Sequence, residues 1–137
     1  MRKIILTRAL VLHDGKYLLL KRAKDDFLSE NVGKWECPGG RVEKGESPEH
    51  CALREFKAET GLEGRVVKEL PFLHMRTDKI DSHCYVYLME IDSEDVKLSD
   101  EHSEHAWVEA REVKNYELVQ FASLLLEYFN NEELYLG

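Results

Sequence analysis

The sequence predicts an α+β fold in which helices flank a mixed β-sheet. Apolar, β-branched segments typical of strands open the chain and return after a central helical pattern, and a second helical pattern closes it. The length of 137 residues suits a single domain, 1–137, with one sizeable hydrophobic core.

The chain is expected to begin with a β-hairpin. Residues 3–12 and 16–22 are apolar runs, and the pair Asp14 and Gly15 between them favours a tight turn. The polar, glycine-containing stretch 23–35 predicts a loop, which leads into a short extended piece ahead of a Pro-Gly-Gly sequence.

A helix is predicted to follow Ser47. Ser47 suits the N-cap, Pro48 suits the first turn, and Gly61 is a favourable C-terminal stop. The side chains expected on its buried face are Ala52, Leu53, Phe56 and Thr60.

Further strands and a second helix complete the expected fold. Residues 64–75 and 82–91 are enriched in strand-forming residues, and another short strand is expected around Trp107. Apolar residues recur at helical spacing from Tyr116 to Tyr128, which predicts an amphipathic helix whose stripe packs on the core.

Charge and cysteine content narrow the class of protein. Nineteen basic and 27 acidic residues give a net charge of -8, which argues against binding to duplex nucleic acid or an anionic membrane. The N-terminal apolar runs are interrupted by Arg8 and His13, so neither a signal peptide nor a spanning helix is expected, and a cytoplasmic location is predicted. Cys37, Cys51 and Cys84 form no CxxC pair and are expected to be reduced, buried thiols.

The segment 40–62, "GRVEKGESPEHCALREFKAETGL", carries the residues suited to chemistry. Glu55 and Glu59 are four residues apart on the predicted helix, so they lie about 40° apart around its axis. Two neighbouring carboxylates repel each other unless a cation such as Mg²⁺ or Mn²⁺ lies between them. Arg54 could hold Glu46 through a bidentate ion pair. A solvated, charged helix is the alternative that the helix alone leaves open.

The same segment resembles the Nudix box, Gly-x5-Glu-x7-Arg-Glu-U-x-Glu-Glu-x-Gly-U, where U is a bulky aliphatic or similar residue, at eight of nine specified positions. The opening hairpin, the "GKWECPGG" sequence and the closing helix extend the resemblance over nearly the whole chain. It implies the α/β/α sandwich of Nudix hydrolases. It also implies metal-assisted attack of water on a pyrophosphate bond of a nucleoside diphosphate linked to a further group, as in nucleoside triphosphates or nucleotide sugars.

The resemblance also implies roles for individual residues. Glu55, Glu59 and the Gly39 carbonyl would hold Mg²⁺ or Mn²⁺, while Glu46 and Arg54 would brace the loop and the helix. Glu55 is also the candidate general base. These residues form the expected catalytic and metal site.

One box position departs from the family pattern, because Ala58 stands where a metal-binding glutamate is expected. Glu101 is the preferred replacement ligand and Glu104 is the second candidate, although a solvated acidic loop explains both equally well. His102 and His105 do not predict a transition-metal pair, since no Cys or third His is nearby in sequence. The rival reading is a weakened Nudix-fold domain that binds nucleotides or regulates.

Substrate contacts are predicted from residues outside the box. The candidates for binding phosphate are Arg22, Lys34 and Arg41. The aromatic residues that could stack on a base, with core packing as the alternative, are Phe27, Trp35 and Phe72. The expected partner is a small nucleotide, and a homodimer is compatible with the family.

Overall fold

Seven strands and one α-helix organise the described part of the chain, residues 1–24, 31–119 and 122–123, in the computed structural model. The elements in chain order are β1 (Arg2–His13), β2 (Lys16–Arg22), β3 (Trp35–Glu36), β4 (Gly39–Arg41), α1 (Pro48–Thr60), β5 (Gly64–Arg76), β6 (Ile80–Ile91), β7 (His102–Glu109) and the 3-10 helix η2 (Ala110–Asn115).

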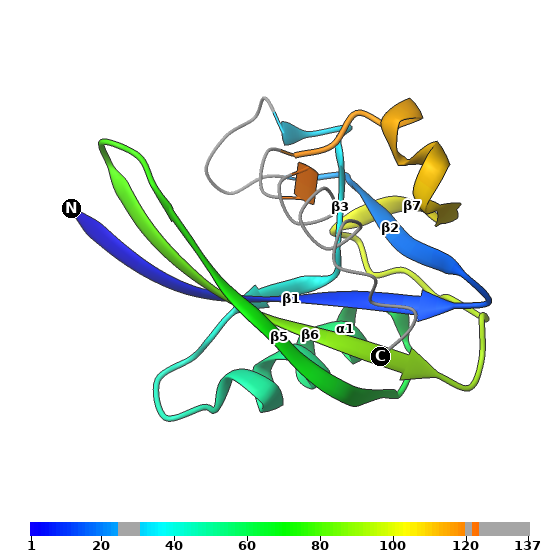
Figure 1. Cartoon of the computed structure of the whole chain (residues 1–137), viewed down its shortest axis with the longest axis horizontal. Helices are drawn as coiled ribbons and strands as arrows, with labels where there is room; N and C mark the ends of the chain where they lie inside the picture. Colours follow the sequence, from blue (N-terminus) through cyan, green and yellow to red (C-terminus); the bar gives the residue numbers. More distant parts are fainter. Residues whose placement is uncertain (25–30, 120–121, 124–137) are drawn as a thin grey trace.

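The sheet is mixed, as predicted. Its strand order is β3-β2-β1-β6-β5, with β4 paired to β1 and β7 paired to β2. β1 and β6 run parallel, whereas the other pairs are antiparallel. β1 joins the two halves of the sheet, because most of its length pairs with β6 and its last residues pair with β2 (Figure 1).

The predicted opening hairpin is confirmed. Its turn residues Asp14 and Gly15 have φ angles of 51° and 76°. Two successive positive φ angles characterise the type I′ turn, whose twist matches that of the strands it joins.

The predicted limits of α1 are also confirmed. The Ser47 hydroxyl accepts a hydrogen bond from the His50 amide at 3.1 Å, and Pro48 occupies the first turn. Gly61 ends the helix in the left-handed conformation, with φ of 74°, and its amide donates to the Lys57 carbonyl. Such caps satisfy backbone groups that the helix itself leaves unpaired.

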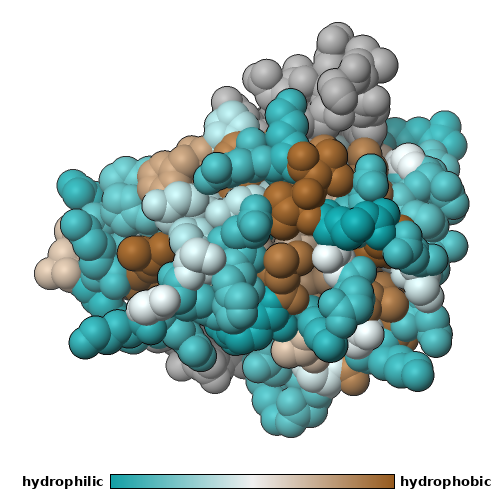
Figure 2. Space-filling view, turned by 90° about the horizontal axis from the view of Figure 1, so that it is seen from below, coloured by the Kyte–Doolittle hydropathy of each residue, from teal (hydrophilic) through white to brown (hydrophobic). Residues whose placement is uncertain are grey.

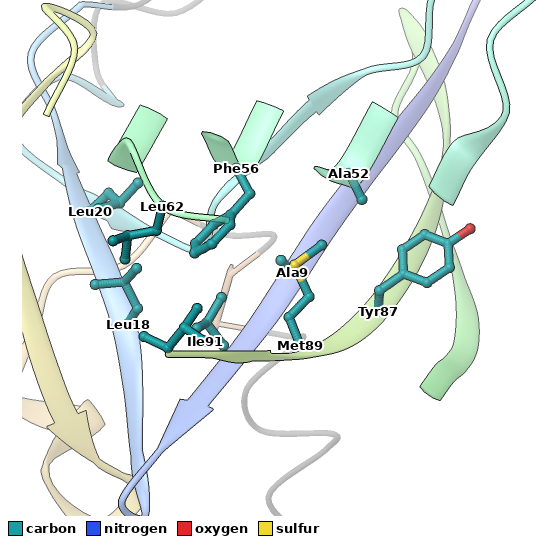
Figure 3. Close-up of a cluster of buried hydrophobic side chains, with 10 residues drawn as sticks. Ala9, Leu18, Leu20, Ala52, Phe56, Leu62, Tyr87, Met89 and Ile91 are labelled. Atoms are coloured by element: carbon teal, nitrogen blue, oxygen red, sulfur yellow. The ribbon is translucent and has the colours of Figure 1, made fainter. Parts of the chain in front are cut away.

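Two hydrophobic clusters lie on opposite faces of the sheet. Phe56 and Ala52 of α1 point into one of them, where they meet Leu18 and Met89 (Figure 3). Leu19, the residue after Leu18 in β2, belongs to the other cluster, because successive side chains of a strand point to opposite faces of the sheet. α1 therefore covers one face of the sheet, and its box carboxylates Glu55 and Glu59 lie beside β4.

The three cysteines are free and buried, as predicted. Burial raises the pKa of Cys37 and that of Cys84 to about 12, which keeps both thiols protonated and unreactive at neutral pH.

The second predicted helix extends beyond the described residues. The predicted helix from Tyr116 to Tyr128 is wrong over its first four residues, 116–119, which are not helical because their backbone pairs with Trp35 through a β-bridge at Leu118. Ala122 and Ser123 are helical, and the other residues of the predicted helix lie outside the described residues. No described helix has the length and apolar character needed to cross a membrane. The surface on the α1 side is mostly hydrophilic, with apolar side chains in scattered groups (Figure 2).

Candidate active site

Two adjacent glycines of β4 lie directly against the carboxylates of Glu55 and Glu59 in α1. The Gly39 amide donates a 2.9 Å hydrogen bond to Oε1 of Glu59. A Cβ atom on Gly40 would lie 2.5 Å from Cδ of Glu55, so any side chain at position 40 would displace that carboxylate. The spacing of the glutamates and the glycine pair, noted separately in the sequence, thus form one structure.

Glu59 is a buried carboxylate, with 3% of the residue exposed. Burial raises its pKa well above the usual range, and the charges of Glu36 and Glu55 add to this effect, whereas Arg8 and the Gly39 amide oppose it. A divalent cation is the group that relieves such repulsion, and carboxylate oxygens are the ligands that Mg²⁺ and Mn²⁺ prefer. The donor set of this site therefore fits a hard divalent cation.

Arg54 connects the loop before α1 to the helix. Its Nε lies 2.6 Å from Oε2 of Glu46 and its Nη2 lies 3.0 Å from Oε1. Its Nη1 donates to Oε1 of Glu55 at 2.8 Å. The hydrogen bonds from Arg54 lower the pKa of Glu46, so Glu46 is ionised at neutral pH. One guanidinium thus holds both the loop and the carboxylate of Glu55.

We expect Arg54→Lys to lower kcat by about tenfold, because an ammonium group cannot hold two carboxylates in the planar, bidentate arrangement of a guanidinium. Steady-state hydrolysis at saturating Mg²⁺ measures this effect. Arg65→Lys is the matched control, since Arg65 pairs with Glu90 and Asp92 on exposed strand ends. Equal activity of the two variants would contradict the bracing role.

A second network, which sequence reasoning missed, surrounds Glu36 of β3. Nη1 of Arg22 lies 2.9 and 3.0 Å from its two carboxylate oxygens, and Nη2 of Arg8 lies 3.7 Å from Oε1. Nε2 of His102 lies 2.8 Å from Oε2 of Glu36, while Nδ1 of the same ring is 4.0 Å from Oε2 of Glu59. That Nδ1 is buried and has no hydrogen-bond partner among the described residues. The network links β1, β2, β3 and β7 to the helix carboxylate.

The signal for this network was weak in the sequence. Arg8 interrupts an apolar strand, and a charged residue at such a position needs a partner when the strand is central. Glu36 is such a partner, but it lies in a different strand, and the pairing of β4 with β1, which places Gly39 opposite Arg8, brings the two charges together.

The ionisation of Glu36 makes stability depend on pH. Although burial alone would raise it, the charges of Arg8, His102 and Arg22 hold the pKa of Glu36 at about 2, below the value of an unfolded chain. A lowered pKa stabilises the fold above the unfolded pKa of about 4.3, and this contribution is lost as the pH falls toward 2.

Glu36→Gln should therefore reduce the free energy of unfolding by about 2 kcal/mol at pH 7 and flatten its decline between about pH 4.5 and 2. Urea denaturation over a pH series measures both effects. Glu69→Gln, on the exposed side of β5, is the control and should keep the wild-type profile. An unchanged acid slope in Glu36→Gln would show that Glu36 does not carry this effect.

The structure separates the candidates for the missing box ligand. Glu101 is exposed, and its carbonyl accepts a hydrogen bond from the Ala23 amide. Glu104 is exposed and pairs with Lys21 at 3.0 Å. Among the described residues, Glu36 and His102 are the side chains close enough to share a metal ion with Glu59, and neither Glu101 nor Glu104 belongs to this group. Ligation by Glu101 stays a prediction.

The predicted phosphate-binding residues flank this region. Arg22 is turned toward Glu36, Lys34 directly precedes β3, and Arg41 ends β4. Their contacts with phosphate stay predictions. Of the aromatic candidates, Trp35 packs edge-on against Tyr116, Phe72 is exposed, and Phe27 lies outside the described residues.

Comparison with known proteins identifies the family. The model of the NUDIX domain family matches residues 4–129. The chain belongs to the Nudix family. It is 30% identical over 129 residues to nucleoside triphosphatase NudI of Escherichia coli O81 (strain ED1a), covering 86% of this chain and 90% of that protein.

Solved Nudix structures agree with the fold. A MutT protein from Methanosarcina mazei Go1 has a TM-score of 0.82 at 29% identity, covering 97% of this chain and 96% of its own. The NUDIX domain of Shewanella oneidensis NrtR, complexed with ADP ribose, has a TM-score of 0.78 at 20% identity over 96% of this chain and 89% of its own, a likeness of fold alone. The predicted Nudix sandwich is confirmed.

Family membership fixes the class of reaction. The chain is a Nudix hydrolase acting on a pyrophosphate bond of nucleotide substrates, in a family that generally uses divalent metal ions. The rival reading of a domain that only binds or regulates is not favoured.

Proposed function

We propose that this Nudix hydrolase is a nucleoside triphosphate pyrophosphohydrolase dependent on Mg²⁺ or Mn²⁺. The observation that carries the proposal is the contact of Gly39 with Glu59 and of Gly40 with Glu55, which gathers two box carboxylates beside a backbone turn. The relationship to a nucleoside triphosphatase supports this substrate class over nucleotide sugars.

In this proposal Glu55, Glu59 and the Gly39 carbonyl hold the cation, and Glu101 is the further predicted ligand. The bound cation would supply electrostatic stabilisation of the phosphate charge. The -8 net charge of the chain makes such local positive charge necessary for an anionic substrate. His102 would act through Glu36 and Glu59, by holding the polar network beside them, rather than as a replacement for Ala58.

In this proposal the side chains of the site have different roles in hydrolysis. Glu55, oriented by the hydrogen bond from Arg54 to its Oε1, would take a proton from water. The water oxygen forms a bond to phosphorus while the bond from phosphorus to the bridging oxygen breaks, and the leaving group departs with that oxygen. Arg22, Lys34 and Arg41 would bind the phosphates that flank the reacting bond.

A panel of nucleotides tests the proposal. The protein is incubated with nucleoside triphosphates, a nucleotide sugar and ADP-ribose, each with Mg²⁺ or Mn²⁺, and products are separated by ion-exchange chromatography. We expect kcat/KM to be at least about tenfold higher for a triphosphate than for the other classes. A higher value for the sugar or for ADP-ribose would overturn the substrate class, and absence of turnover with every compound would overturn the hydrolase proposal.

Position 58 offers a gain of function. Ala58 is exposed on α1, three residues after Glu55 and directly before Glu59, so a glutamate there can extend without a clash in the core. We expect Ala58→Glu to lower the Mg²⁺ concentration needed for half-maximal activity by about tenfold, through one more oxygen ligand. Ala58→Gln, of equal length and without charge, is the control. A metal titration unchanged from the wild type would mean that position 58 does not face the cation.

Three predictions about the protein as a whole accompany this function. We propose a single domain over 1–137, a cytoplasmic location and assembly as a homodimer. The buried, free thiols of Cys37, Cys51 and Cys84 support a reducing compartment. Light scattering at several protein concentrations tests the assembly.

A further inference from the structure

A second group of metal-ligand side chains lies on the hairpin of β5 and β6, outside the box. His74 of β5 is directly opposite His83 of β6, and Asp81 is two residues before His83 on the same strand. Because side chains alternate between the faces of a sheet, these three project from one face of the hairpin. The pairing of the strands alone therefore brings two imidazoles and a carboxylate together.

The side-chain atoms converge as the backbone pattern requires. The two imidazole rings are stacked, with centroids 4.4 Å apart and planes inclined by 17°. Nε2 of His74 is hydrogen-bonded to Oδ1 of Asp81, and Nε2 of His83 lies 3.4 Å from the same oxygen. One ligand atom from each residue lies within 4.8 Å of the others. Both rings thus turn the same nitrogen toward a single carboxylate.

The charge of Asp81 and the shielding of Nε2 of His83 from solvent favour the binding of a cation. Only 8% of the Asp81 side chain is exposed, and the hydrogen bond from His74, with Arg76 nearby, lowers its pKa to about 2. Asp81 is therefore an anion at neutral pH. Nε2 of His83 is shielded from solvent, makes no well-oriented hydrogen bond to a described residue and lies 3.4 Å from Oδ1 of Asp81, where a cation can take the place of a shared proton.

Aromatic side chains border the group on one side. The ring of Phe72 lies 5.5 Å from that of His83 and 5.2 Å from that of Tyr85. Phe72 is 46% exposed, so it forms an apolar edge beside the polar atoms rather than part of the core. An apolar border lowers the local dielectric and strengthens the binding of a cation to nearby ligands.

We propose that His74, His83 and Asp81 form a second metal site, which binds a divalent transition metal of the zinc type. Two imidazole nitrogens and one carboxylate oxygen are ligands that Zn²⁺ accepts in tetrahedral sites, and they leave a fourth position for water or another molecule. The box site offers oxygen ligands suited to Mg²⁺ or Mn²⁺. The chain would thus hold two chemically different cations on different elements.

Zinc titration of the full-length, tag-free protein in excess Mg²⁺ tests this site. We expect isothermal titration calorimetry to record a zinc-binding event that is about a hundredfold weaker, or lost, in both His83→Ala and Asp81→Asn. His105→Ala is the matched control, because it removes an exposed histidine of β7 and should leave this event intact. Circular dichroism establishes that each variant is folded.

Replacement of Zn²⁺ by Co²⁺ provides a readout independent of the variants. Tetrahedral Co²⁺ with imidazole ligands absorbs visible light, and we expect this band in the wild type and in His105→Ala but not in His83→Ala. Zinc affinity equal to the wild type in both hairpin variants, or absence of the cobalt band from the wild type, would overturn the proposal. Neither result bears on nucleotide hydrolysis at the box, so the two proposals fail separately.

Discussion

Replacement of Glu59 by Gln should lower kcat by about a hundredfold or more, the largest loss of activity expected from a single isosteric change in this protein. Gln keeps an oxygen that can accept the hydrogen bond from the Gly39 amide, but it removes the negative charge that would hold the cation. Hydrolysis of the best triphosphate at saturating Mg²⁺ measures the loss. Glu49→Gln, in the exposed first turn of α1, is the control.

The same variant should be more stable than the wild type when no divalent metal is present. Burial and the neighbouring carboxylates raise the pKa of Glu59, so its ionisation opposes folding at any pH above the unfolded pKa of about 4.3. Gln carries no charge and escapes this penalty. In the presence of a chelator, Tm should therefore exceed that of the wild type at pH 7, and the difference should disappear near pH 4. Equal activity, or a lower Tm at pH 7, would contradict the assigned role.

Gly39→Ala should cause the largest loss of stability, about 4 kcal/mol. An added Cβ would lie 2.0 Å from the Thr7 carbonyl oxygen and 2.9 Å from Cα of Arg8, both in the backbone of the adjacent strand. These atoms belong to the pairing of β4 with β1 and cannot move without breaking it. Urea denaturation monitored by circular dichroism measures the loss.

Gly45→Ala is the informative control for this change. Gly45 also has a positive φ angle, of 82°, but a Cβ there would meet no atom within 4 Å. Its replacement should cost only about 1 kcal/mol, the strain of an L-residue in that conformation. A similar loss for both variants would mean that backbone conformation, rather than the contact with β1, explains the requirement for Gly39.

Much of the fold could be predicted because its signals are local. The Asp14 and Gly15 turn, the Ser47 cap and the Gly61 stop each depend on a few neighbouring residues, and each lies where it was expected. Helical spacing likewise predicted that Glu55 and Glu59 share one side of α1. Local geometry determines such features before any tertiary contact forms.

The rest of the site depends on strand pairing, which a single sequence does not reveal. Arg8 and Glu36 meet because β4, which follows Glu36 closely in the chain, pairs with β1, and His102 reaches Glu36 because β7 and β3 both pair with β2. His102 opens β7 and is buried, whereas Glu101 directly precedes the strand and is exposed, and its ligation of the cation stays a prediction. A shift of one residue in a strand exchanges its two faces.

The activity of this site depends on the pairing of the short strand β4 with β1. Its pairing of Gly40 with Thr7 joins positions 33 residues apart, and its two glycines are the surface on which the helix carboxylates rest. A molecule in which β4 has left β1 would keep much of its hydrophobic core but would have no organised centre for phosphate chemistry. Turnover therefore reports only molecules in which β4 is paired with β1. On heating, hydrolysis should disappear before the circular dichroism signal of the sheet does.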